Sequence, residues 1–228
     1  MANNWVSYIT DQVPPITQAE KENNVAIIWN TLGSLGYTAE AVAAIAGNME
    51  YEGFINPGQY EIGYNYSLSA GGGMCGWTPI YYSGSVIAEQ NRHLKNCCDN
   101  WGINWLDGDS QLRYLNYEMT DWYGLDRLQF DTNPQAPSLG YPLLSPLTAQ
   151  QFIVSTISVT DLAAYWELYY ERPYDAGATI SNRQSSATFW YNYIQTLPPP
   201  TPPVPPTPAR RKMPIWMMCR RNKTTRRF

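Results

Sequence analysis

The sequence predicts a mostly helical α+β domain with a small β-hairpin or sheet inserted early in the chain. Several segments repeat apolar residues at i, i+3, i+7 and i+10, which is the spacing of amphipathic helices. Residues 58–82 instead combine glycines, aromatic residues and short alternations, a texture typical of short strands and turns. A proline-rich run at 198–208 then ends the domain.

The predicted helices begin and end at recognisable capping residues. Thr17 and Glu20 form a capping-box pattern for the first helix, and Gly36 is a natural stop. Later helices are predicted to begin after a capping hydroxyl, at Thr38, Thr148, Thr160 and Ser181. The helices are expected over about 18–35, 39–52, 110–122, 148–157, 160–171 and 182–195, with a loop over 124–147.

Charge is divided unevenly along the 228 residues. The formal charge is −4, but residues 1–209 hold all 19 acidic side chains and carry −12, whereas residues 210–228 carry +8. This split indicates an acidic body with a basic interaction tail, and it argues against nucleic-acid binding by the body. The 18 Tyr and 9 Trp, against 5 Phe, suit half-exposed surfaces such as sugar-binding clefts.

We predict three parts: a domain over residues 1–197, a rigid linker over 198–208 and a tail over 209–228. The linker has eight prolines in eleven positions, which favours polyproline II and a spacer of roughly 34 Å. The tail is basic at both ends around an apolar centre, so it is either a solvated arm or an anchor to a protein or an anionic surface. No signal-peptide pattern opens the sequence and no run has the ~18 apolar residues of a membrane span, so we expect synthesis in a cytoplasm.

Metal-binding residues are scarce. The chain has a single histidine, His93, with Cys97 and Cys98 at helical spacing from it and Cys75 as a conceivable further ligand. Catalytic zinc sites rely on several histidines or on mixed ligand sets, so we expect no metal and no cofactor. These three of the four cysteines are expected to be free buried thiols, with a bond from Cys75 to one of the pair left open.

Glu52 is the acidic residue that the helical pattern singles out. At about 100° per residue it shares a face with Val42, Ile45 and Met49, whereas Glu50 lies on a flank expected to face water. A carboxyl held against apolar surface is harder to ionise, so its pKa is expected to rise, as a general acid that protonates a glycosidic oxygen requires. The alternative is a helix-end glutamate that turns outward or pairs with an arginine.

Three ordered motifs connect the chain to a known family. They are IAGNMEYEGFINPG at 45–58, GMCGWTP at 73–79 and YYERP at 169–173. Over roughly 20–195 the chain resembles the phage tail-associated lysozymes, which are muramidase domains carried by virions that infect Gram-positive hosts. The resemblance implies a lysozyme-like fold in which the β insert flanks a cleft, and it implies that Glu52, three residues after GNM, is the catalytic acid.

Two positions depart from the family pattern. The family usually has a small polar residue where this chain has Gly53, and a Gln before the Trp where this chain has Gly76. The missing Gln removes a potential contact to substrate or water, which keeps open the alternative of a structural tail protein with a weak or inactive fold.

Glu61 is the candidate for a second carboxylate, because the resemblance implies that it faces Glu52 across the cleft. Retaining glycosidases place two carboxyl groups ~5–5.5 Å apart, and inverting ones ~6.5–9.5 Å. The alternative for Glu61 is an exposed loop charge. Without a second acid, a lytic transglycosylase remains possible, in which the muramic C6 hydroxyl attacks and a 1,6-anhydro product forms.

Other side chains near these motifs have weaker roles assigned to them. Glu171 and Arg172 are interpreted as a structural ion pair or part of a buried network. The candidate substrate-binding positions, for which core packing is the alternative, are Tyr60, Tyr64, Gly76, Trp77 and Tyr81.

These features predict a virion-associated N-acetylmuramidase that cuts peptidoglycan glycan strands locally during phage infection, with Glu52 as general acid. A lytic transglycosylase that uses Glu52, and a structural tail protein, are the alternatives. The expected partners are peptidoglycan and, through the basic tail, phage tail structural proteins or an anionic wall polymer or membrane surface. The expected location is the phage tail.

Overall fold

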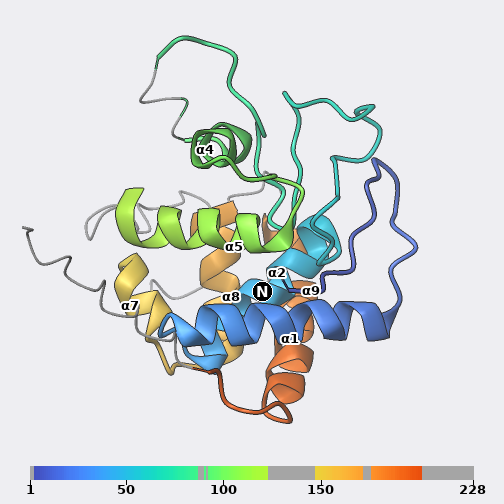
Figure 1. The fold of residues 1–228 in the computed structure, drawn as a ribbon. Helices are drawn as coiled ribbons and strands as arrows, with labels where there is room; N and C mark the ends of the chain where they lie inside the picture. Colours follow the sequence, from blue (N-terminus) through green and yellow to red (C-terminus); the bar gives the residue numbers. More distant parts are fainter. Residues whose placement is uncertain (1–2, 87–89, 91, 123–146, 172–175, 202–228) are drawn as a thin grey trace, which may run out of the picture.

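The computed structural model describes residues 3–86, 90, 92–122, 147–171 and 176–201 (Figure 1). Its mostly helical architecture confirms the helical part of the predicted fold. None of the described helices combines the length and the apolar composition of a membrane span. The described elements are α1 (Gln18–Ser34), α2 (Ala39–Gly53), α4 (Leu94–Trp101), α5 (Gly108–Tyr117), η1 (Glu118–Trp122), α7 (Ala149–Ile153), α8 (Val159–Tyr165), η3 (Trp166–Glu171) and α9 (Ala176–Ile194), where η marks a π-helical turn.

Helix α2 is the central element of the core. Every residue from Ala41 to Met49 is buried, so the helix is covered on all faces and not only along the predicted stripe. Helices α1, α8 and α9 pack against it (Figure 1). Its small residues permit this close packing, since a Cβ on Gly47 would lie 2.5 Å from the backbone nitrogen of Ala187 on α9.

Local capping signals set most of the helix starts. Thr17 and Thr148 form complete capping boxes, and the Thr38 side chain accepts from the N–H of Ala41, so these three predicted N-caps are confirmed. The predicted caps Thr160 and Ser181 are wrong. Helix α8 begins after Ser158, and α9 begins at Ala176, so both residues lie inside helices.

The predicted β-hairpin or sheet does not form. Within the described part of the chain, residues 58–82 make only isolated bridges, which join Tyr60 to Gly72, Gly72 to Trp77 and Gln59 to Thr10. A regular ladder is interrupted because several residues adopt the left-handed backbone conformation, namely Gly63, Asn65, Tyr66, Gly73 and Gly76.

Buried amide side chains hold this irregular segment in place of a strand ladder. On α5, Gln111 accepts from the N–H of Met74 at 2.9 Å and donates to the carbonyl of Pro57 at 2.7 Å. Asn56 accepts from the N–H of Tyr8 at 2.8 Å and donates to its carbonyl at 2.7 Å. These amides satisfy backbone groups that a sheet would pair, and they fix the segment against the C-terminal end of α2.

The cysteines of the described region are buried and free. Cys75, Cys97 and Cys98 form no disulfide, as predicted. Burial raises the pKa of the Cys97 and Cys98 thiols to about 12, so they carry no thiolate at neutral pH. No group of three potential metal ligands occurs among the residues that the structure describes.

The start of the proline-rich segment lies against α1. The indole N–H of Trp29 donates to the carbonyl of Pro198 at 3.1 Å, and the N–H of Thr201 donates to Asn30 Oδ1 at 3.2 Å. The chain therefore remains in contact with the domain beyond the predicted end at 197. The rest of the predicted linker, the tail at 209–228 and most of the predicted loop at 124–147 lie outside the described residues.

Candidate active site

Glu52 lies in the last turn of α2, where the chain changes direction. Gly53 ends the helix, and Phe54 and Ile55 follow with φ of 56° and 57°. The N–H of Phe54 bonds back to the carbonyl of Met49, which closes the helix end. The Glu52 side chain is 24% exposed, so it reaches from the buried helix to the surface of the core.

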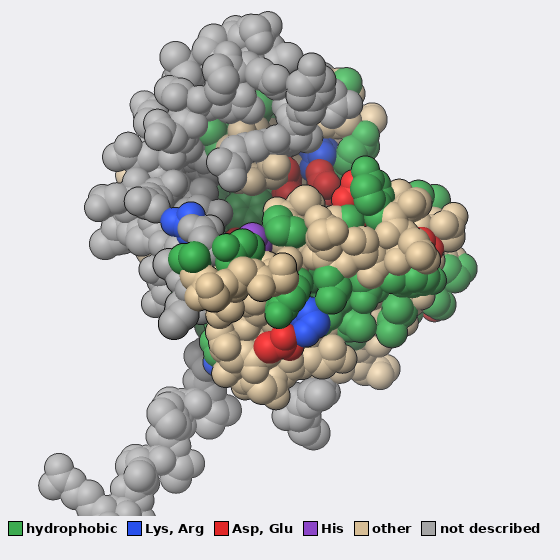
Figure 2. All heavy atoms as spheres, turned by 90° about the horizontal axis from the view of Figure 1, so that it is seen from above, with side chains coloured by type: hydrophobic (Ala, Val, Ile, Leu, Met, Phe, Trp, Pro, Cys, Tyr) green, Lys and Arg blue, Asp and Glu red, His purple; other side chains and the backbone are tan. Residues whose placement is uncertain are grey.

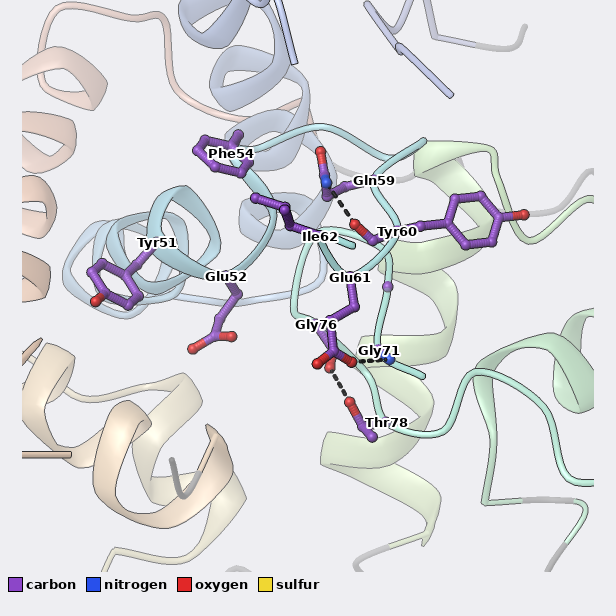
Figure 3. A pocket seen from close by; sticks show the side chains of 11 residues that line it. Tyr51, Glu52, Phe54, Gln59, Tyr60, Glu61, Ile62, Gly71, Gly76 and Thr78 are labelled. Atoms are coloured by element: carbon purple, nitrogen blue, oxygen red, sulfur yellow. Dashed lines mark hydrogen bonds between the residues drawn. The ribbon is translucent and has the colours of Figure 1, made fainter. Parts of the chain in front are cut away.

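A cavity of about 390 Å³ lies beside Glu52 (Figure 3). The end of α2 forms one side of the cavity and the irregular segment forms the other. Tyr51, Phe54 and Tyr60 are among the lining residues, and the Tyr60 ring points away from Glu52 and Glu61 (Figure 3). The volume of the cavity falls within the roughly 300–1,000 Å³ typical of ligand pockets. Seen from above, the molecule has a place where acidic side chains gather beside a basic one (Figure 2).

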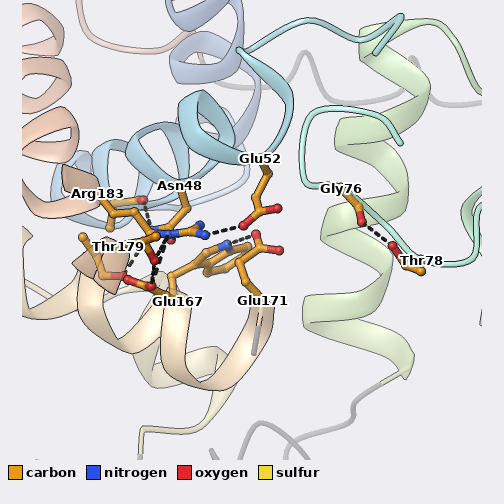
Figure 4. Close-up of polar contacts among 11 residues, drawn as sticks. Asn48, Glu52, Gly76, Thr78, Glu167, Glu171, Thr179 and Arg183 are labelled. Atoms are coloured by element: carbon orange, nitrogen blue, oxygen red, sulfur yellow. Dashed lines mark hydrogen bonds and ion pairs between the residues drawn. The ribbon is translucent and has the colours of Figure 1, made fainter. Parts of the chain in front are cut away.

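Arg183 of α9 binds the Glu52 carboxyl (Figure 4). Its side chain is only 1% exposed. The guanidinium also donates to Asn48 Oδ1 at 3.0 Å, lies 3.4 Å from Glu167 Oε1, and stacks on the Tyr51 ring at 4.4 Å. Several buried groups therefore fix the position of this arginine, and the arginine in turn orients Glu52.

This pairing changes the expected surroundings of Glu52. The sequence predicts a carboxyl held against apolar surface, and that prediction is wrong because a guanidinium lies against it. The alternative of a helix-end glutamate that pairs with an arginine describes the contact correctly. The same carboxyl also lines the cavity, so the ion pair does not remove it from contact with a ligand.

Glu171 approaches Glu52 from the end of η3 (Figure 4). The indole N–H of Trp166 donates to Glu171 Oε1 at 2.7 Å. Burial raises the pKa of Glu171 well above its usual range, and the negative charge of Glu52 raises it further, whereas Arg183 lowers it. The expected network is therefore present around Glu171, but Arg172, its expected ion-pair partner, lies outside the described residues.

Glu61 lines the same cavity as Glu52 (Figure 3). Its Oε2 accepts from the N–H of Gly71 at 2.7 Å, which holds the carboxylate in one orientation. The irregular segment thus brings a second acidic group to the site without forming a strand.

Comparison with known proteins identifies the family of the chain. The family model of phage tail lysozymes matches residues 23–194. The chain belongs to the phage tail lysozyme family. Morphogenesis protein 1 of Bacillus phage B103 is 28% identical over 179 residues, which cover 78% of this chain and 41% of that protein. The match therefore spans about two fifths of the length of this relative.

The two departures from the usual phage tail lysozyme pattern meet at Glu52. A Cβ on Gly53 would lie 2.4 Å from the carbonyl oxygen of Gly73, and a Cβ on Gly76 would lie 2.9 Å from Glu52 Oε2. Gly76 also has φ of +59°, which disfavours other residues. Both glycines are thus explained by the close approach of the turn at 73–76 to the end of α2.

The predicted substrate-binding rings lie in different surroundings in this phage tail lysozyme. Tyr60 lines the cavity, in edge contact with Tyr66 at 5.2 Å. Tyr64 is 56% exposed and is not part of the cavity lining, and Tyr81 lies beneath the ammonium group of Lys95 at 5.4 Å. Trp77 is 8% exposed and packs in the core.

Trp77 is part of a buried cluster around Glu118 on η1. Its indole N–H donates to Glu118 Oε2 at 2.9 Å, and the Tyr170 hydroxyl donates to the same oxygen. Burial raises the pKa of Glu118 to about 7. Since Trp77 follows Gly76 and Tyr170 precedes Glu171, this one carboxyl connects the two segments that flank Glu52.

Glu50 differs from its prediction as a solvated residue. Its Oε1 pairs with Lys21 at 2.8 Å, and its Oε2 accepts from the indole N–H of Trp190 at 2.9 Å. The flank expected to face water instead faces α1 and α9.

Sequence reasoning missed Arg183, although the pattern contains a signal for it. Ile180, Arg183, Ala187, Trp190 and Ile194 lie three or four residues apart on α9, and all are buried. An arginine within an apolar helical stripe is rarely buried without a partner. That position therefore indicates an acidic partner elsewhere in the fold, and the structure shows two, the fully buried Glu167 and Glu52.

Proposed function

We propose that this phage tail lysozyme is a virion-associated N-acetylmuramidase that degrades peptidoglycan glycan strands locally during infection. The observation that carries the proposal is that the carboxyl of Glu52, oriented by a buried arginine, lines a ligand-sized cavity. In the proposed reaction, Glu52 delivers a proton to the glycosidic oxygen between muramic acid and glucosamine.

Glu61 is the proposed second group of the reaction. Its carboxylate lines the same cavity, and the N–H of Gly71 orients it through Oε2, so that Oε1 would position water for attack on the anomeric carbon. Tyr60, which lines the cavity, and the backbone around Gly76 would contact the sugar rings. Tyr64, Trp77 and Tyr81 would contact the substrate if the glycan extends beyond the cavity or if these side chains move when it binds.

A lytic transglycosylase is the second candidate. One observation favours it: Glu61 Oε2 is already bound by a backbone N–H, which restricts its role as a base. In that reaction Glu52 would both donate the proton to the leaving oxygen and accept one from the attacking muramic hydroxyl.

Digestion of purified peptidoglycan separates these functions, with products identified by mass spectrometry. New reducing ends at muramic acid support the muramidase, and 1,6-anhydro ends support the transglycosylase. Glu52→Gln is expected to abolish either product. Glu50→Gln is the matched control because it changes a glutamate two residues away that contacts Lys21 and not the cavity. An active Glu52→Gln protein would refute the site, and an inactive wild-type protein would favour a structural tail role.

The partners and location follow the same proposal. A relative is named as a morphogenesis protein of a phage, which supports a virion component that reaches the cell wall with the particle. The basic residues 210–228 would attach the domain to tail structural proteins or to an anionic surface. The proline-rich residues 198–208 would serve as the spacer between the two.

A further inference from the structure

The site gathers more carboxyl groups than its guanidinium can neutralise. Arg183 binds Glu52 and lies 3.4 Å from Glu167 Oε1, so two acidic groups already share its charge. Glu171 adds a third, and its carboxyl group points toward that of Glu52 (Figure 4). Two adjacent carboxyl groups rarely both carry charge, because each disfavours ionisation of the other.

Glu171 faces charged and titratable groups from several elements. They are Glu52 on α2, Arg183 on α9, Glu118 on η1 and the thiol of Cys75 in the irregular segment. Among the described residues that act on Glu171, Arg183 is the cation. It binds Glu52 directly, and Glu171 receives its neutral hydrogen bond from Trp166. The surroundings of Glu171 thus favour the protonated form of its carboxyl group.

The position of Glu171 is fixed by rigid neighbours. The Trp166 ring that binds its Oε1 stacks on Tyr170 with centroids 4.0 Å apart and packs against Phe152 at 5.3 Å. A carboxyl group held in this way does not need to reorganise in order to exchange a proton with its neighbour.

We propose that Glu171 is the proton store of the site and acts through Glu52. This inference rests on the proposed role of Glu52 as the proton donor. The proton on Glu171 passes to Glu52, which delivers it to the glycosidic oxygen, and the electron pair of the broken C–O bond goes to that oxygen. Water then adds to the anomeric carbon and releases a proton, which restores Glu171. Glu171 is therefore a positioning residue that does not itself touch the sugar.

The Glu171→Gln variant tests this role because the amide retains the shape and can still accept from Trp166, but it cannot store an acidic proton. The measurement is the pH profile of peptidoglycan cleavage. We expect the alkaline limb to move to lower pH by about one unit or more, with activity at acid pH changed far less. Glu50→Gln, a control at a glutamate that contacts Lys21 and Trp190 and does not act on Glu171, should leave the limb nearly in place. An equal loss at every pH, with an unmoved limb, would overturn the proposal in favour of a structural role.

A second measurement does not depend on enzymatic activity. In carbon NMR of the glutamate carboxyl groups, one signal should disappear in Glu171→Gln, and in the wild type it should titrate well above the range of free glutamate. In Glu52→Gln the same signal should titrate at lower pH by about one unit or more, because the adjacent negative charge is gone and Arg183 remains.

The two measurements keep this inference separate from the proposed function. A Glu171 signal that titrates in the ordinary range, or that ignores Glu52→Gln, overturns the proton store whatever the protein does to peptidoglycan. The expected NMR behaviour in a protein that cuts no glycan would support proton storage and reject the hydrolase. If Glu171→Gln does not fold, the comparison of the wild type with Glu52→Gln still decides the question.

Discussion

Glu118 links the stability of the protein to pH. Its side chain is buried, with 4% exposed, and accepts hydrogen bonds from Trp77 and Tyr170. Burial raises its pKa from 4.5 to about 7, and these hydrogen bonds only partly oppose the increase. The folded protein therefore prefers the protonated carboxyl, whereas the unfolded chain ionises it at its ordinary pKa.

The sign and size of the effect follow from these two values. Below pH 4.5 both states hold the proton, and the contribution to stability is fully present. As the pH rises through about 7, the folded state must bury a charge, and that contribution is lost. The two values differ by about 2.5, which at 1.36 kcal/mol for each unit corresponds to about 3 kcal/mol.

Denaturant unfolding of the wild type and of Glu118→Gln between about pH 4 and 8.5 measures this loss. Because Gln does not titrate, the variant should gain about 3 kcal/mol relative to the wild type across that range. The comparison cancels the titration of most other groups, provided that the denaturant dependence of the two proteins stays equal. A free-energy difference that stays constant with pH, or that moves in favour of the wild type, would refute the reasoning.

Two further predictions concern the contacts of the Glu52 carboxyl. Arg183→Met should cost about 3–5 kcal/mol of unfolding free energy because it leaves buried carboxyl groups uncompensated, and adding Glu167→Gln should recover part of that loss. Additive effects in a double-mutant cycle would contradict this coupling. Gly76→Ala places a side chain at φ +59° with its Cβ 2.9 Å from Glu52 Oε2, so we expect a loss of about 1–2 kcal/mol and reduced cleavage activity. Gly63→Ala is the matched control, since it has φ +83° and nothing within 4 Å of the added Cβ; it should lose stability but keep activity, and an equal loss of activity in both variants would exclude the contact with Glu52 as the cause.

The sequence predicts most of the helices because their signals are local. The capping box at Thr17 and the apolar repeat of α2 depend only on residues within a few turns, and both are present as expected. The position of Glu52 at the end of α2 follows from the same repeat. Its aromatic and acidic neighbours do not, because they come from parts of the chain far apart in sequence.

The irregular segment was harder to predict for a physical reason. Its alternating aromatic residues and glycines are compatible with a hairpin, but its backbone is held by Gln111 and Asn56, which lie outside or at the edge of the segment. A short strand and an amide-supported loop have similar local sequence, and only the distant partner distinguishes them. Arg183 illustrates the converse, since its place in an apolar stripe indicates a buried ion pair but not which acid completes it.

The docking of Pro198 on α1 affects how the domain would respond to mechanical force. A pull on the C-terminal end of the described chain is met first by the Trp29 and Asn30 hydrogen bonds and by the close contact of Pro200 with Gly33. These contacts divert tension into α1 before it reaches the last turn of α9. α9 carries the arginine that binds Glu52. The contacts of the first proline-rich residues with α1 are therefore expected to keep a pulling force from displacing that arginine.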